Sequence, residues 1–303
     1  MEAGNEQLRI GELSRRTGVR PELLRAWERR YGLLRPSRTD GGFRLYSPAD
    51  ERRVSLMRSH LQHGMSAAEA ARLTLTEADG DSRAQDEPIL QRRAQELREA
   101  LNDLDESAAQ TTLDSVLAEF SPETVLANLV LPYLRELGER WARGEASVGQ
   151  EHFASQLLRG RLLGLARGWD RGAGPRALLA CAPGEQHDLG LIAFGLALRA
   201  RGWRITYLGQ DTPLETLAET SRSLGPQAIV IAAASPDRLS HSGAELRRLA
   251  STAKVWLAGP GACAALAKEA RAAFLDVDPL TAADRVAATR PEVPKPLSSV
   301  ASP

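Results

Sequence analysis

A histidine between two glycines is the residue of this chain best placed to bind a ligand. The segment reads Gly184-Glu185-Gln186-His187-Asp188-Leu189-Gly190 and lies between two apolar runs, 176–182 and 189–198. This order predicts a strand, a loop and a helix, with the loop at the carboxyl end of the strand. Ligands of open parallel sheets bind at that edge, and glycine lets them approach the backbone closely. The same histidine could also be an ordinary surface or capping residue.

A tryptophan, a carboxylate and an imidazole form a second group. Trp141 ends one expected helix and Ser147 caps the next, so Val148, Glu151 and His152 share one face of that helix. These side chains would converge at one end of a helical bundle. The alternative without a ligand is a core tryptophan beside a surface Glu-His pair.

Arginines near the amino terminus form a third group. An expected helix at 21–31 displays Arg25, Arg29 and Arg30, and an expected hairpin at 35–46 carries Arg38 and Arg44. Guanidinium groups bind phosphates and base edges. Residues 1–75 are net basic and residues 80–172 net acidic, on a chain of formal net charge +0. An anionic partner is therefore expected for the amino-terminal part alone.

Turn and helix signals place these groups in separate domains. Two short helices, the hairpin and a capped helix from Pro48 predict a helix-turn-helix domain in residues 1–78. Residues 79–88 are polar and predict a linker. Helical periodicity in 89–104, 107–119, 121–143 and 147–167 predicts a four-helix bundle in residues 89–172, and Pro132 is expected to kink its third helix.

Alternating apolar runs and helices predict a doubly wound, five-stranded α/β domain in residues 173–290. A flavodoxin-like strand order, 2-1-3-4-5, would bring His187 to the same sheet edge as Ser235, Gly259 and Gly261. Glycines and a hydroxyl beside a histidine suit a bulky ligand with a nucleotide-like tail. The G-x-G-x-x-G pattern of a dinucleotide site is absent after the first strand. Residues 291–303 are expected to be a disordered tail.

Residues 8–76 resemble the winged helix-turn-helix of the MerR family. The resemblance rests on R-A-W-E-R-R-Y-G at 25–32 and on R-P-x-R-T-x-G-G-x-R-L-Y at 35–46. It implies binding to a double-stranded DNA operator. The three helix arginines would lie at the major groove, and Arg44 would enter the minor groove near Arg38, since a narrow groove attracts arginine.

Residues 88–290 resemble the cobalamin-binding fold of light-responsive CarH-type regulators, including its helical cap. The resemblance rests on Trp141 followed after nine residues by Glu-His, and on Glu-x-His-x-x-Gly at 185–190. It implies that His187 is the lower axial ligand of cobalt and that Glu185 accepts from its other ring nitrogen. The implied cofactor contacts are Trp141, Val148, Glu151, His152, Glu185, His187, Asp188, Gly190, Ser235, Gly259 and Gly261.

Three positions depart from the family pattern. Glu185 stands where the family more often has aspartate, and Ala258 stands where a Gly-Gly pair is usual. Ala142 follows Trp141, whereas some members carry a histidine there that becomes the upper cobalt ligand after illumination. A methyl group cannot ligate cobalt, so we expect weaker cobalamin retention after illumination than in a protein with that histidine.

The resemblance implies a transcriptional repressor and not an enzyme. Adenosylcobalamin would assemble a homo-oligomer, as a tetramer if the family holds, on the operator in the dark. Light would cleave the cobalt–carbon bond and separate the subunits, so that multivalent DNA binding is lost and carotenoid or other photoprotective genes are derepressed.

Two other functions are considered. A cobalamin-carrying module of a methyltransferase or mutase would need a substrate barrel of roughly 250 further residues. A MerR-type repressor that works without cobalamin would not need Trp141, Glu151, His152 and His187 together. The chain has no signal peptide and no apolar run of about 18 residues, so a cytoplasmic protein without membrane contact is expected. Cys181 and Cys263 support neither a disulfide framework nor a zinc site.

Overall fold

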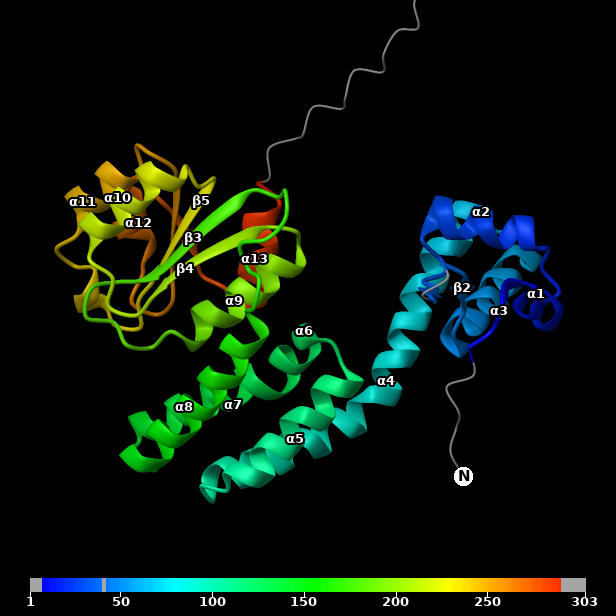
Figure 1. The fold of residues 1–303 in the computed structure, drawn as a ribbon, viewed down its shortest axis with the longest axis horizontal. Coiled ribbons are helices and arrows are strands. Elements are labelled where there is room, and N and C mark those ends of the chain that lie inside the picture. The colour runs from blue at the N-terminus through cyan, green and yellow to red at the C-terminus, as the bar shows by residue number, and fades with distance from the viewer. Residues whose placement is uncertain (1–6, 40–41, 290–303) are drawn as a thin grey trace, which may run out of the picture. The chain divides into compact units, whose positions relative to one another are not determined.

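The computed structural model describes residues 7–39 and 42–289, with the backbone alone at residues 38 and 79–85. These residues form two compact units, one up to Leu90 and one from Gln91 (Figure 1). The predicted disordered tail, 291–303, lies outside the described residues. No helix in the described ranges combines the length and the apolar character needed to span a bilayer.

The amino-terminal unit is a helix-turn-helix followed by a two-stranded hairpin and a third helix. Helix α1 (Ile10–Thr17) ends at Gly18 and α2 (Pro21–Tyr31) ends at Gly32, both with positive φ angles. Strands β1 (Ser37–Arg38) and β2 (Arg44–Leu45) pair antiparallel and are followed by α3 (Pro48–Gln62). The unit has its own core, in which the largest buried side chains are Leu13, Leu24, Trp27, Leu33, Tyr46 and Met57.

The segment predicted to be a linker is helical. Helix α4 (Ala67–Asn102) runs through residues 79–88, including Pro88, and also includes the first predicted helix of the bundle. The sequence did not predict this helix, because polar residues together with Gly80 and Pro88 are typical of a loop. The composition of residues 79–88 does not favour a helix, since Asp, Gly, Ser and Pro outnumber the good helix formers Arg, Ala, Gln and Glu. Extending a helix from formed turns on both sides is, however, much easier than nucleating one.

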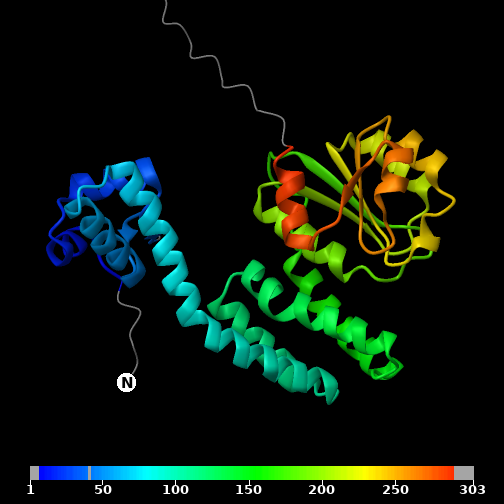
Figure 2. The same cartoon turned by 180° about the vertical axis from the view of Figure 1, so that it is seen from behind.

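Helices α4 and α5 (Glu106–Glu119), the segment 122–142 and α8 (Val148–Leu165) form the helical region of the carboxy-terminal unit (Figure 2). The segment 122–142 is α6 (Pro122–Val125), a π-helical turn η1 (Leu126–Val130) and α7 (Leu131–Ala142). The π-turn ends two residues before Pro132. This proline lacks the N–H that an α-helix would use, and the hydrogen-bond pattern is displaced by one residue. The irregularity therefore occurs where the proline predicted it.

The α/β part contains the predicted five-stranded parallel sheet. Its strands are β3 (Arg176–Cys181), β4 (Arg204–Gly209), β5 (Ala228–Ala232), β6 (Lys254–Ala258) and β7 (Ala273–Leu275). Their order is β4-β3-β5-β6-β7, which confirms the predicted flavodoxin-like topology and places the switch point between β3 and β5.

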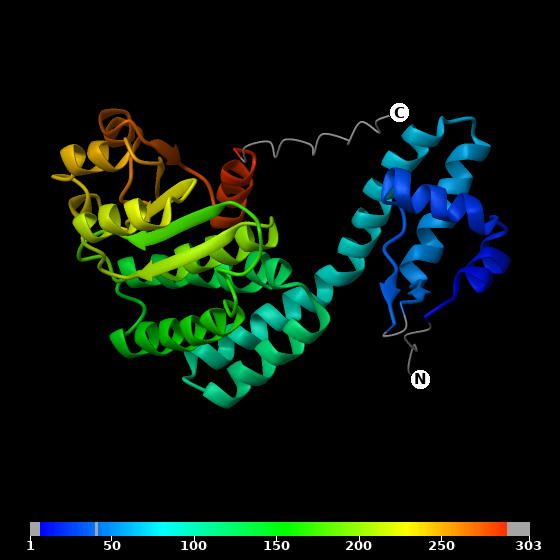
Figure 3. The same ribbon diagram turned by 45° about the horizontal axis from the view of Figure 1, so that its top comes forward.

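Helices cover the sheet as in other doubly wound folds (Figure 3). They are α9 (Leu189–Ala200), α10 (Leu214–Leu224), α11 (Gly243–Leu249), α12 (Ala264–Ala270) and α13 (Pro279–Ala287). Apolar residues of α10, α11 and α12 pack in one core with β3, β5 and β6. Helix α9 packs against β3, β4, α13 and the helical region, through α8 and α6. Because α9 has neighbours on several sides, apolar residues occupy most of its surface.

Gly195 on α9 gives a test of this packing. A Cβ atom at Gly195 would lie 2.8 Å from Cη2 of Trp169 and 3.0 Å from Cδ1 of Leu179. We expect Gly195→Ala to lower the free energy of unfolding by about 1–2 kcal/mol, because overpacking outweighs the gain in helix propensity. Gly160→Ala on α8 meets nothing within 4 Å, so it should raise stability by up to about 1 kcal/mol.

Denaturant unfolding followed by tryptophan fluorescence measures both variants. Equal stability changes in the two variants would contradict this account of α9.

Candidate functional site

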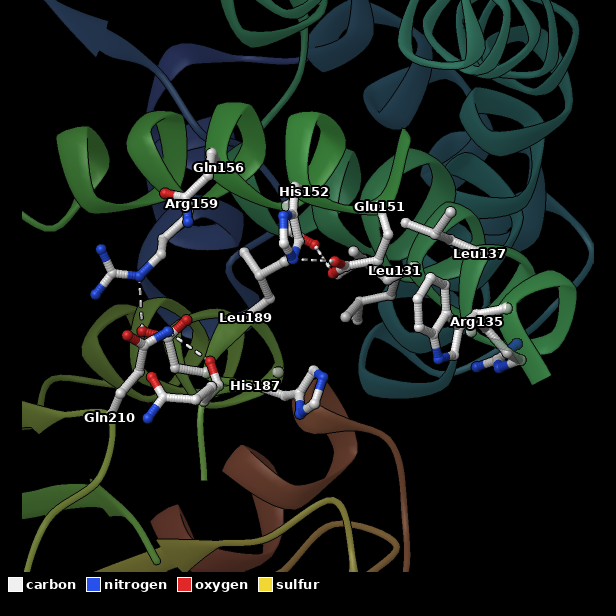
Figure 4. Close-up of a pocket in the computed structure, with 17 residues that line it drawn as sticks. Leu131, Arg135, Leu137, Glu151, His152, Gln156, Arg159, His187, Leu189 and Gln210 are labelled. Atoms are coloured by element: carbon white, nitrogen blue, oxygen red, sulfur yellow. Dashed lines mark hydrogen bonds and ion pairs between the residues drawn. The ribbon is translucent and has the colours of Figure 1, made fainter. Parts of the chain in front are cut away.

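A cavity of about 690 Å³ lies between the helical region and the loop that follows β3 (Figure 4). Helices α7 and α8 supply one wall, and the loop at 186–190 supplies the other. The described lining residues are Leu131, Leu134, Arg135, Leu137, Gly138, Trp141, Glu151, His152, Ser155, Gln156, Arg159, Gln186, His187, Asp188, Leu189, Gly190 and Gln210. Six of the predicted site residues are among them, and they come from two segments that lie far apart in the sequence.

His187 presents a free ring nitrogen to this cavity. Its side chain is 76% exposed, and Nδ1 lies 2.6 Å from Oε1 of Glu185. A carboxylate acceptor at Nδ1 favours the tautomer with the proton on Nδ1 and the lone pair on Nε2. Nε2 has no hydrogen-bond partner in the described part of the chain, so it can act as a metal ligand.

Glu185 fixes the position of that histidine. Its side chain is only 2% exposed, and it accepts from the backbone N–H of His187 at 2.9 Å and of Ala234 at 2.7 Å. Burial alone would raise the pKa of Glu185, but these hydrogen bonds and the His187 ring lower it below its ordinary value. Glu185 is therefore a carboxylate that ties the loop to the chain after β5, and it is not part of the cavity wall.

Asp188 is also held behind the surface of the loop. Its side chain is 2% exposed and its Oδ2 accepts from Nε of Arg159 at 2.8 Å and from the Tyr207 hydroxyl at 2.5 Å. Burial and this hydrogen bond raise the pKa of Tyr207 well above its ordinary value near 10. The tyrosine therefore stays neutral, and its hydroxyl donates a hydrogen bond to the carboxylate.

Trp141, Glu151 and His152 lie on the opposite wall. Trp141 is 47% exposed, and Glu151 accepts from Ser155 Oγ at 2.7 Å while its other oxygen lies 3.5 Å from Nε2 of His152. The predicted convergence of these three residues is therefore present in the structure. Val148, expected on the same face, is exposed but is not among the lining residues.

A second, smaller cavity of about 310 Å³ also has His187 and Gly190 in its wall. Helix α9, the carboxyl ends of β5 and β6, and α13 form the rest, with small residues such as Ala232 and Gly259. A Cβ atom at Gly259 would lie 2.5 Å from the carbonyl oxygen of Ala233, so only glycine fits. Ser235 and Gly261 lie against each other nearby, since a Cβ at Gly261 would lie 2.4 Å from the Ser235 carbonyl oxygen. They are not lining residues.

Several lining residues were not predicted. The missed lining residues of α7 lie on the same helical face as Trp141. Leu134, Gly138 and Trp141 follow Leu131 by three, seven and ten residues, which is the spacing of one face. That spacing was a usable signal, because the tryptophan was already a candidate. Gln210 directly follows the second strand, so its position at the carboxyl edge of the sheet was a usable signal. For Phe194 in the smaller cavity, the sequence carries no comparable signal.

The arginines of the amino-terminal unit form a separate surface. Arg25, Arg29 and Arg30 are exposed on α2, while Leu24 and Trp27 of the same helix are buried. Arg44 donates through Nε to Glu28 at 2.9 Å, and this hydrogen bond raises the pKa of Arg44. The predicted wing arginine is thus anchored to α2, the helix that carries Arg25, Arg29 and Arg30. The side chain of Arg38 lies outside the described atoms.

Comparisons with known proteins agree with this division. Residues 8–76 match a family described as MerR HTH family regulatory protein, and residues 93–163 and 175–284 each match a family described as B12 binding domain. The HTH-type transcriptional repressor CarH of Myxococcus xanthus is 34% identical over 266 residues, which cover 84% of this chain and 89% of that repressor. The repressor CarA of the same organism is 35% identical over 227 residues, which cover 74% of this chain and 75% of CarA.

The carboxy-terminal unit also resembles a solved structure. The monomethylamine corrinoid protein of Methanosarcina barkeri superposes with a TM-score of 0.54 at 18% identity, covering 63% of this chain and 95% of that protein. At this identity the similarity concerns the fold alone. The relatives that cover most of the chain, together with the matches to all three of its parts, show that it belongs to the CarH-type family of cobalamin-binding MerR transcriptional repressors.

Proposed function

We propose that this chain is a light-responsive repressor that uses adenosylcobalamin as its chromophore. The observation that carries the proposal is the free Nε2 of His187, which lies at the junction of the two cavities. When bound, adenosylcobalamin supplies a cobalt–carbon bond that light can cleave. The chain's own part is to ligate, orient and enclose the cofactor, and we assign it no catalytic activity.

The residues present fit such a cofactor. A corrin would bring its own ligands to cobalt, so the imidazole of His187 would be sufficient as the ligand from the protein. In the described residues no group of three or more His, Cys, Asp or Glu side chains could hold a metal ion without a corrin. The cavity lined by small residues of β5 and β6 would take the nucleotide tail, and the larger cavity below α7 and α8 would take the upper face.

We further propose that the wall of α7 and α8 distinguishes the adenosyl form from cobalamins with a small upper ligand. Trp141 supplies a flat apolar surface, and Glu151 supplies a carboxylate that can accept from ribose hydroxyl groups. A ligand that binds this wall differently in assembled and separated subunits shifts the equilibrium between them. In the assembled state several amino-terminal units would bind one operator, which raises affinity through multivalency.

The first prediction concerns the lower ligand. His187→Ala should lose or greatly weaken cobalamin binding, or leave the nucleotide base on cobalt, because no other described side chain offers a free imidazole at the junction of the cavities. Absorption spectra and equilibrium dialysis of protein incubated with adenosylcobalamin in the dark measure this. His152→Ala is the matched control and should keep the lower ligand. Wild-type affinity and spectrum in His187→Ala would remove the assignment.

The second prediction concerns the upper wall. Wild-type protein should assemble in the dark with adenosylcobalamin but not with methylcobalamin, since the indole must move to admit a large upper ligand. Trp141→Ala should assemble with both. Sedimentation velocity in the dark and after green light distinguishes the cases. Equal assembly of the wild type with both cobalamins would defeat selection by Trp141.

The third prediction concerns DNA. Arg44→Ala should weaken operator binding, either by ~1–3 kcal/mol with relaxed specificity if it reads a base or with a salt slope smaller by about one if it contacts a phosphate. Fluorescence anisotropy at several salt concentrations separates the two. Arg92→Ala removes the same charge from an exposed i,i+4 pair outside the amino-terminal unit and should leave binding unchanged. Unchanged affinity in Arg44→Ala would contradict the wing assignment.

A further inference from the structure

The carboxylate of Asp188 joins three segments of the carboxy-terminal unit. Asp188 directly follows His187 and precedes the first residue of α9. Its Oδ2 accepts from Arg159 of α8 at 2.8 Å and from the hydroxyl of Tyr207 of β4 at 2.5 Å. One buried oxygen therefore connects the helical region, the histidine loop and the sheet.

Helix α8 carries this connection on the same face as the cavity wall. Glu151, Ser155 and Arg159 are spaced four residues apart and so lie above one another along the helix. In Figure 4 the side chains of Glu151 and Arg159 both point from α8 toward the wall of the cavity that contains His187 and its loop. A displacement of α8 that moves Glu151 must therefore also move Arg159.

The pair resists separation because Asp188 is almost fully buried. Moving Arg159 away would leave a buried carboxylate without its charged partner, which is much more costly than breaking an exposed pair. The planar guanidinium of Arg159, which donates through Nε, also fixes the direction of this hydrogen bond more firmly than a lysine would. In the described part of the chain, this is the one ion pair between α8 and the loop at 184–190.

A second charged connection between the helical region and the α/β part lies elsewhere. Arg201, just after α9, donates to Glu123 of α6 at 2.5 Å and to Asp284 of α13 at 2.6 Å. This connection does not involve the loop. It therefore provides a comparison for an ion pair that holds the two parts together without touching His187.

We propose that Asp188 is a positioning residue that couples the place of helix α8 to the orientation of His187. A ligand in the larger cavity that displaces α8 then also displaces the imidazole of His187, through Arg159 and Asp188. A movement of the loop displaces α8 in the same way. The meaning of this coupling for cobalamin rests on the proposed function. The coupling itself is a property of the chain and can be measured without a ligand.

Hydrogen–deuterium exchange of the ligand-free full chain tests it. Arg159→Met keeps the length of the side chain and removes the charge, so peptides covering 183–190 should exchange at least about threefold faster through local opening. Glu123→Gln, the matched control, should leave that loop unchanged. Peptides from β5 should be unaffected in both variants, which separates coupling from general loss of stability.

Three further variants, measured in the same way, test whether the effect depends on the interaction between Arg159 and Asp188. Arg159→Lys should restore part of the protection, because it restores the charge but not the planar guanidinium. Asp188→Asn should speed exchange in α8 around residue 159, because coupling is reciprocal. Adding Asp188→Asn to Arg159→Met should have much less effect on the loop than the sum of the single changes, since both remove the same interaction.

The proposal is overturned if loop exchange in Arg159→Met equals that of the wild type, or if Glu123→Gln speeds it as much. A spectrum of the wild-type protein with adenosylcobalamin in the dark separates this from the proposed function. Absence of cobalamin binding together with the expected exchange pattern would leave the coupling standing and remove the cofactor assignment. Ligation of cobalt by the histidine without the expected exchange pattern would leave the cofactor assignment standing and remove the coupling.

Discussion

The hydrogen bonds of the Glu185 carboxylate are the constraint on which the site depends. They join the backbone of the β3 loop, the ring of His187 and the backbone after β5 in one buried group. Without the carboxylate, two backbone N–H groups would lose their acceptor and the imidazole would lose the partner that fixes its tautomer. The direction of the free ring nitrogen is thus set from behind the site, at the point where the strand order reverses.

Two different surfaces meet at this nitrogen. On the sheet side, close approach of the chain after β5 to the chain after β6 leaves a narrow space, and a side chain at Gly259 would collide with the backbone. On the helical side, α7 and α8 supply leucines, an indole and a few polar groups around a larger space. The narrow space on the sheet side would exclude a wide ligand group, whereas the larger space on the helical side would admit groups of different size. In the proposed function, the helices would therefore select among ligands and the sheet would anchor them.

The sequence predicted the sheet order and the junction at His187 because both depend on regular patterns. Alternating strands and helices allow few topologies, and residues after parallel strands meet at one edge. The cavity wall was harder, since a leucine that faces a cavity and one that faces a core have the same helical spacing. Val148 shows that helical spacing alone does not identify a cavity wall. It shares a face with Glu151, yet as the first residue of α8 it is not part of the cavity wall. The helical character of residues 79–88 was missed because polarity distinguishes a surface from a core, not a helix from a loop.

In the proposed function the protein would supply one ligand to the metal, His187, and the site would therefore obtain its specificity from shape. In a zinc site the number and type of the ligands select the metal, whereas here a single imidazole would bind many metal complexes. What separates one complex from another is the volume on each side of the ring and the rigidity with which the ring is held. Larger side chains at positions 190 and 259 should therefore affect cofactor binding as much as replacement of His187, although neither residue offers a polar side chain. Two buried carboxylates, at 185 and 188, flank one exposed histidine, and their hydrogen bonds hold the loop that presents it.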